Sequence, residues 1–158
     1  MVSRTFYLGN VEKFRYVKGH LVVELMTMNP RATAESKIGF IHDTGAFITV
    51  INRTHFNALN IEASGIKLMP CDIGSYGNKV PGHTWTLPFL FVGGFTASNV
   101  QCFTPLDYRR RQNLLGMNVL ARFNQYIDTT NARVYFEKNL GDVSAYHMLC
   151  GEVFLTEK

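Results

Sequence analysis

In Gly39-Phe40-Ile41-His42-Asp43-Thr44-Gly45-Ala46, a short apolar run leads into a carboxylate, a hydroxyl and a glycine. Glycine lets the backbone turn tightly without a Cβ clash, and the threonine hydroxyl is available for a local hydrogen bond. The pattern predicts a single acid, Asp43, presented at a turn that follows a strand. No second Asp-Thr-Gly or Asp-Ser-Gly occurs in the sequence. If Asp43 works with a partner carboxylate from the same motif, that partner must come from another copy of the chain.

The composition is that of an ordinary globular domain. The chain has 158 residues, of which 46% are hydrophobic and 18% are charged. A single domain of this size buries roughly two-thirds of its unfolded surface. The formal net charge is only +4, and the one basic run, Arg109-Arg110-Arg111, lies between apolar segments. A solvated loop explains this run better than a nucleic-acid contact, because no basic stripe accompanies it.

The cysteines and histidines predict neither a disulfide framework nor a metal site. Cys71, Cys102 and Cys150 are few and scattered, and their odd number favours a reducing, cytoplasmic setting. No stretch is apolar enough for a signal peptide or a membrane span. We therefore expect no metal, no cofactor and no membrane partner. No pair of histidines has ligand spacing among His20, His42, His55, His83 and His147.

Periodicity predicts mostly strands. The expected strands are residues 21–26, 37–42, 47–51, 84–91, 95–103, 125–128, 133–136 and 152–156. Short helices are expected at residues 53–59 and 117–123. Residues 72–82 are rich in turn-forming residues and suit a hairpin tip, Gly93-Gly94 marks another turn, and Pro88 indicates an edge or a bulge. The predicted fold class is all-β and mainly antiparallel, a small closed barrel with one or two short helices.

Three of these features, taken in order, resemble the retropepsin-like aspartic peptidases, the single-domain relatives of retroviral proteases. The first is Phe40-Ile41-His42-Asp43-Thr44-Gly45-Ala46. The second is the hairpin Gly74-Ser75-Tyr76-Gly77 at the position of the family's flap. The third is Asn113-Leu114-Leu115-Gly116 with the helix after it. The likeness spans about residues 20–137 of a single domain, 1–158, which leaves extensions at 1–19 and 138–158.

The resemblance implies an acid-protease barrel that forms an obligate two-fold homodimer. Asp43 is then the catalytic acid, and Thr44, Gly45 and Ala46 support the active-site loop. Gly74, Ser75, Tyr76 and Gly77 form a flap that binds peptide substrate, and Leu114, Leu115 and Gly116 support the loop from the core. The expected activity is peptide hydrolysis by a water that two Asp43 carboxylates activate, without a cofactor.

Four positions depart from the family pattern. His42 is usually apolar there; on a strand its side chain faces away from Asp43, so we expect a packed or hydrogen-bonded histidine rather than a catalytic base. Asn118 stands where many cellular relatives carry Asp. Phe47 and Ile48 replace acids that help retroviral enzymes to hold the substrate backbone, which suggests a more apolar pocket wall.

Two alternatives to an active peptidase remain at this point. The same barrel could serve as a non-catalytic dimerisation or peptide-binding module, or the chain could be a precursor that cleaves itself within its extensions. Other acids have simpler interpretations: Asp72 suits the base of a hairpin, and Asp128 suits a hydrogen bond at the side of a turn.

Overall fold

The computed structural model describes residues 4–139 and 153–157. Its first six strands are β1 (Arg4–Tyr7), β2 (Val11–Val17), β3 (His20–Met28), β4 (Glu35–His42), β5 (Thr49–Val50) and β6 (Met69–Ser75). The other strands are β7 (Asn78–Val92), β8 (Phe95–Pro105), β9 (Leu114–Leu115), β10 (Phe123–Asp128), β11 (Arg133–Lys138) and β12 (Val153–Thr156). The helical elements are α1 (Arg53–Ala58), the 3₁₀ turn η1 (Glu62–Ser64) and α2 (Met117–Leu120).

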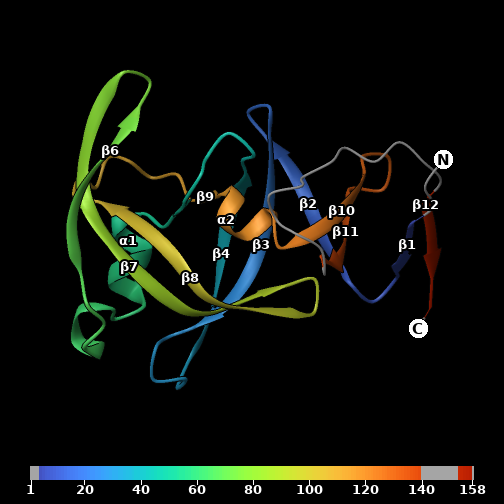
Figure 1. Cartoon of the computed structure of the whole chain (residues 1–158), viewed down its shortest axis with the longest axis horizontal. Helices are drawn as coiled ribbons and strands as arrows, with labels where there is room; N and C mark the ends of the chain where they lie inside the picture. The colour runs from blue at the N-terminus through green and yellow to red at the C-terminus, as the bar shows by residue number, and fades with distance from the viewer. Residues whose placement is uncertain (1–3, 140–152, 158) are drawn as a thin grey trace.

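Ten strands form one sheet that closes on itself (Figure 1). Their order is β10-β11-β2-β3-β4-β9-β5-β8-β7-β6, and β3 also pairs with β7 through Met26 opposite Phe91. Strands β3, β4, β9, β5, β8 and β7 therefore make a closed barrel, while β10, β11, β2 and β6 extend it. Most pairs are antiparallel; β4–β9 and β5–β8 are parallel. The predicted all-β, mainly antiparallel barrel with short helices is confirmed.

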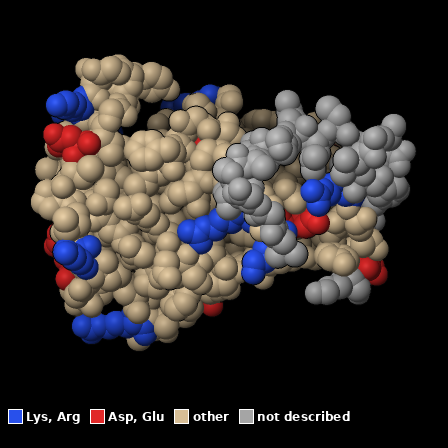
Figure 2. Space-filling model, viewed as in Figure 1, with Lys and Arg blue, Asp and Glu red and all other residues tan. Residues whose placement is uncertain are grey.

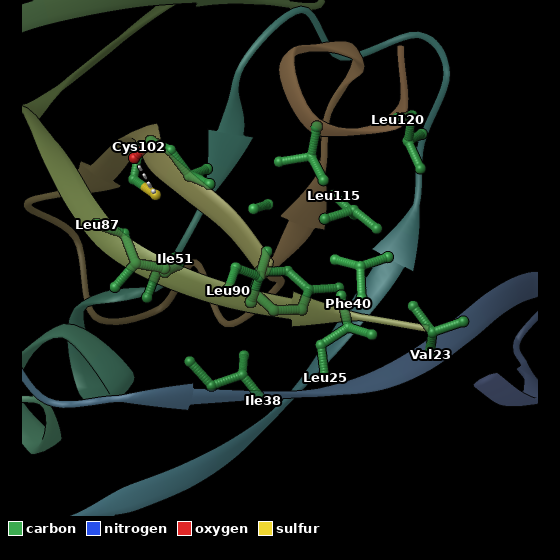
Figure 3. Packing of buried hydrophobic residues seen from close by; sticks show 14 of the residues in the cluster. Val23, Leu25, Ile38, Phe40, Ile51, Leu87, Leu90, Cys102, Leu115 and Leu120 are labelled. Atoms are coloured by element: carbon green, nitrogen blue, oxygen red, sulfur yellow. Dashed lines mark hydrogen bonds between the residues drawn. The ribbon is translucent and has the colours of Figure 1, made fainter. Parts of the chain in front are cut away.

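Every second side chain along the strands points inward, and these apolar side chains fill the barrel (Figure 3). Ile38 and Phe40 of β4 are fully buried, whereas Lys37, on the opposite face of the same strand, is exposed. The close-up shows these two side chains meeting Leu25 of β3 and Leu90 of β7 inside the barrel. Full burial of such a side chain contributes roughly 1.5–3 kcal/mol, so this interior is what holds the strand leading to Asp43.

The turn predicted at Gly93-Gly94 is present, and Pro88 lies where β7 has few strand contacts. Gly93 and Gly94 have φ of 55° and 82°, which suits the two-residue turn between β7 and β8. Pro88 lies between the segments of β7 that pair with β6 and with β3, and the β7–β8 register also omits it. The ladder is interrupted at this residue, which has no amide hydrogen to donate, and Asn99 on β8 has a positive φ of 52°. An interruption inside the sheet fits the predicted bulge better than the predicted edge.

Two predicted elements are longer in the sequence analysis than in the structure. The helix expected at 117–123 ends at Leu120, because Phe123 is drawn into the core and opens β10 opposite Lys138. The strand expected at 47–51 is reduced to Thr49–Val50, which pair with β8 and β9. Those predictions were wrong about length, since both boundaries are set by contacts with distant strands.

Both ends of the described chain take part in sheets. Residues of β2 lie between β11 and β3, with Phe14 buried, and β1 pairs in parallel with β12. The rings of Phe6 and Tyr126 lie 6.2 Å apart, which places β1 against β10. Most of the predicted tail, including Cys150, lies outside the described residues. None of the helices described is long and apolar enough to cross a membrane.

Candidate active site

Asp43 lies one residue beyond the end of β4, at the point where β4 runs parallel to β9. Ile41 pairs with Leu114 and His42 with Leu115. The Asp43 N–H continues this ladder by donating to the Leu115 carbonyl at 3.1 Å. The apolar run before the acid and the Leu-Leu pair of β9 therefore fix the backbone position of Asp43.

The turn after Asp43 is stabilised by its own carboxylate. The Gly45 N–H donates to Asp43 Oδ1 at 2.9 Å, and the Ala46 N–H donates to the Asp43 carbonyl at 3.3 Å. Thr44 and Gly45 are exposed, whereas Asp43 and Ala46 are half-buried. One carboxylate oxygen is thus held by the turn, and the side chain remains partly open to solvent.

The residues predicted to support this loop lie against it. The Met117 N–H at the start of α2 donates to the Ala46 carbonyl at 2.7 Å. Gly116 is buried, and a Cβ at this position would lie 2.5 Å from the Ile48 carbonyl carbon and oxygen. A side chain there would push apart the two segments that flank the acid, so glycine is required.

Thr49 and Asn118 connect the two segments through side chains. The Thr49 hydroxyl donates to Asn118 Oδ1 at 2.8 Å and accepts the Gly116 N–H at 3.2 Å, while Asn118 Nδ2 donates to the Gln101 carbonyl at 2.8 Å. An aspartate at position 118 could not make this last bond. Sequence reasoning missed Thr49, because a threonine within a short strand carries no signal of such a role.

His42 is hydrogen-bonded, as predicted. Its Nε2 lies 2.7 Å from Gln125 Oε1 on β10, and Gln125 Nε2 donates to the Leu120 carbonyl at the end of α2. The second bond fixes the amide of Gln125, so Nε2 of His42 must be the donor. This pair links the end of β4 to α2 on the side away from the Asp43 turn.

The predicted hairpin exists and joins the loop through an apolar cluster. Strands β6 and β7 pair from Met69 to Ser75, and Tyr76 and Gly77 form the tip with φ of 48° and 79°. Tyr76 is 103% exposed and Gly74 is exposed, while Ser75 is half-buried. Within the described part of the chain, no hydrogen bond or ion pair joins residues 74–77 to residues 43–46.

The apolar cluster beneath this hairpin is a feature that the sequence analysis missed. Ile48 and Val50 follow the Asp43 turn, and they pack with Val80 of β7 and Phe103 of β8. Ile73 of β6 and Leu114 of β9 pack at its edge and stay half-buried. Ile48 is only 7% exposed, whereas Phe47 is 70% exposed. Of the two departures from the retroviral acids, only Phe47 therefore presents a large apolar surface to solvent.

A buried arginine near the base of the hairpin was also missed. Arg53 of α1 donates to the carbonyls of Pro105 and Thr104, contacts His83 Nδ1 at 3.3 Å and lies over the Phe56 ring. These contacts join α1 to β7 and β8. A basic residue at the start of a predicted helix gave no indication of burial.

Asp128 and Asp107 have structural partners within their own turns. Asp128 accepts from the backbone and side chain of Asn131, as its predicted turn role requires, and these bonds lower its pKa. Arg109 lies 3.1 Å from Asp107 and lowers the pKa of that carboxyl. All three arginines of the run at 109–111 are exposed. Within residues 4–139 and 153–157, no group of three His, Cys, Asp or Glu side chains could hold a metal.

Comparison with known proteins agrees with this geometry. Residues 32–122 match the family model described as "gag-polyprotein putative aspartyl protease". Among solved structures, a retropepsin-like aspartic protease from Rickettsia conorii is 23% identical, with a TM-score of 0.56 over 80% of this chain and 87% of that one. The EIAV protease in complex with the inhibitor HBY-793 is 16% identical, with a TM-score of 0.50 over 67% of this chain and 89% of that one. No curated protein matches. The expected resemblance in fold is confirmed.

Proposed function

Because the chain belongs to the gag-polyprotein aspartyl protease family, we propose that it is a homodimeric aspartic endopeptidase in which each copy supplies Asp43. One observation carries the proposal: a single Asp-Thr-Gly-Ala turn at the end of β4, braced by Leu115 and Met117. A two-fold axis places the same residue on both sides of an interface, so one motif per chain suffices. A cytoplasmic location, expected from the scattered cysteines, is part of the same proposal.

The chemistry requires the two carboxylates to share one proton. Like charges about 3 Å apart repel by about 5.5 kcal/mol at an effective dielectric near 20. This separates the two proton affinities by about 4 pK units, as is general for aspartic-peptidase dyads. The ionised carboxylate takes a proton from the attacking water, and the protonated one donates a hydrogen bond to the carbonyl oxygen. The pair then titrates as a unit.

The β6–β7 hairpin is proposed as the flap that closes over the peptide and excludes water. The apolar cluster of Ile48, Val50, Val80 and Phe103 packs the hairpin, near its Ile73–Val80 pair, against the strand that follows Asp43. Motion of the hairpin is thereby coupled to Ile48 and Val50, which follow the Asp43 turn. The exposed Tyr76 ring at the tip is its substrate-contacting group.

Apolar side chains near the scissile bond are the preferred substrate feature. Ile73 and Leu114 present half-buried apolar surface, and Phe47 is exposed next to the Asp43 turn. Transfer of apolar substrate surface onto these side chains is favourable at about 25 cal/mol per Å². An extended peptide with apolar residues on both sides of the cleaved bond therefore fits best.

Cleavage of a peptide library by the wild type, by Asp43→Asn and by Asp128→Asn tests this function. Asp43→Asn keeps the size of the side chain but removes the proton-sharing carboxylate, so we expect hydrolysis to fall at least about a thousandfold. Asp128 lies in a distant turn, and its variant should retain activity. Equal rates for the wild type and Asp43→Asn would overturn the catalytic role. Peptide binding without hydrolysis by either protein would favour the non-catalytic module.

A further inference from the structure

A charged groove lies on the outer face of β2, β3, β4 and β11. Its volume is about 480 Å³. Six charged residues line it: Glu12, Lys13, Arg15, Glu24, Lys37 and Arg133. Val11 and Val22 add apolar surface between them. In the view of Figure 2, Lys and Arg side chains gather beside an acid in the region where Figure 1 places β2, β10 and β11.

Strand β4 connects this groove to the proposed active site. Lys37 alternates with the buried Ile38 and Phe40, so its side chain stands on the outer face. Asp43 follows Lys37 by six residues, which is about 20 Å along a strand at about 3.3 Å per residue. The groove begins nearer the site, at Val22 opposite Ile41, but a peptide that occupies the site needs about six further extended residues to reach Lys37.

Positive charge prevails in the groove because both acids are engaged. Arg15 lies 3.7 Å from Glu24, and its guanidinium reaches across β3 to lie 3.7 Å from a Cβ built on Gly39. Glu12 is half-buried and accepts the Gly93 N–H at 2.9 Å, and burial raises its pKa. Within the described chain, Lys13 and Lys37 make no ion pair within 4 Å. With Arg15 paired to Glu24, three cations of the lining, Lys13, Lys37 and Arg133, remain without an ion pair among the described residues.

We propose that this groove is an exosite that binds an acidic segment of the protein substrate, at least about six residues from the scissile bond. The inference rests on the peptidase function proposed above. Charge complementarity selects the occupant: carboxylates of an extended peptide can pair with Lys13, Lys37 and Arg133, which stand on three different strands. The two acids and the valines of the lining suit a peptide better than a continuous phosphate backbone.

Binding can be measured without turnover on the full-length Asp43→Asn protein. The probe is a fluorescent peptide of about eight residues in which Glu alternates with Ser, compared with a Gln version. We expect the acidic peptide alone to bind, more weakly as salt rises. The double change Lys13→Glu and Lys37→Glu should weaken binding at least about tenfold. Lys67→Glu, a single charge reversal at an exposed site outside the groove, should change it less than about twofold.

Equal binding by the groove variant and Lys67→Glu would overturn the exosite. So would tighter binding of a single-stranded oligonucleotide of equal charge, which would assign the groove to nucleic acid.

Cleavage separates failure of the exosite from failure of the proposed function. Two substrates share one apolar core, and one carries a Glu-rich stretch about six residues away. The wild type should cleave the acidic substrate with a KM at least about fivefold lower, and the groove variant should lose only this preference. Cleavage of both substrates with the same KM would overturn the exosite alone. If the acidic peptide binds in a charge-dependent way but neither substrate is cleaved, the peptidase function is overturned and the groove remains a binding site.

Discussion

At Asp43, the carboxylate, the preceding peptide and the loop that follows are each held by a different part of the chain. Gly45 holds one carboxylate oxygen, Leu115 accepts the backbone N–H, and Met117 holds Ala46. The partner groups in all three bonds are neutral backbone groups. The orientation of Asp43 therefore depends on neutral groups. A second carboxylate beside it would leave these hydrogen bonds intact.

Thr49 offers a test of that support. Thr49→Val keeps the shape but removes the hydroxyl, which leaves the buried Gly116 N–H and the Asn118 oxygen without partners. We expect the free energy of unfolding to fall by about 2–3 kcal/mol. Thr49→Ser keeps the hydroxyl and should cost about 1 kcal/mol for the lost methyl group. Urea unfolding measures both, and equal losses would contradict a role for the hydroxyl.

Glu12 predicts a pH dependence of stability. Burial raises its pKa in the folded chain, partly offset by the Gly93 N–H and the Lys37 charge. The folded state then binds the proton more tightly than the unfolded state does, so ionisation of Glu12 destabilises the fold as pH rises above about 4.3. Glu12→Gln cannot ionise. Its unfolding free energy, relative to the wild type, should therefore increase between about pH 4 and pH 7; a constant or decreasing difference would refute this.

Among the elements, those fixed by local chemistry could be predicted and those fixed by distant contacts could not. Turns at Tyr76-Gly77 and Gly93-Gly94 follow from glycine's freedom at positive φ, and the acid turn follows from its own four residues. The end of α2 depends on the burial of Phe123, and the pairing of β3 with β7 closes the barrel. Arg53 became buried only because α1 packs against β8. Nothing near these positions in the sequence carries that information.

The hairpin tip gives a prediction in which stability and activity change in opposite directions. Tyr76 has φ of 48°, which Asn adopts more readily. Tyr76→Asn should stabilise the fold by about 0.5–1 kcal/mol. The same change removes the exposed ring, so kcat/KM for peptide cleavage should fall. Tyr108→Asn, in an exposed loop, is the control and should leave kcat/KM unchanged. An unaltered kcat/KM in Tyr76→Asn would show that the ring does not touch substrate.

For the whole molecule, a closed barrel presents one acid turn, and the sheet extends beyond the barrel on both sides. The ends of the described chain lie together, since β1 and β12 pair (Figure 1). In the proposed homodimer, a two-fold axis brings two Asp43 side chains together, so that each chain supplies half of an active site.

Subunit mixing tests that claim most directly. Wild type and Asp43→Asn chains are unfolded together, refolded at different ratios, and assayed for peptide cleavage at constant total protein. Random pairing makes activity follow the square of the wild-type fraction, so an equal mixture should retain about one quarter of the activity. Mixing with Asp128→Asn should cause no loss. Activity that falls linearly, to about one half in the equal mixture, would show that each chain works alone and would contradict the shared site.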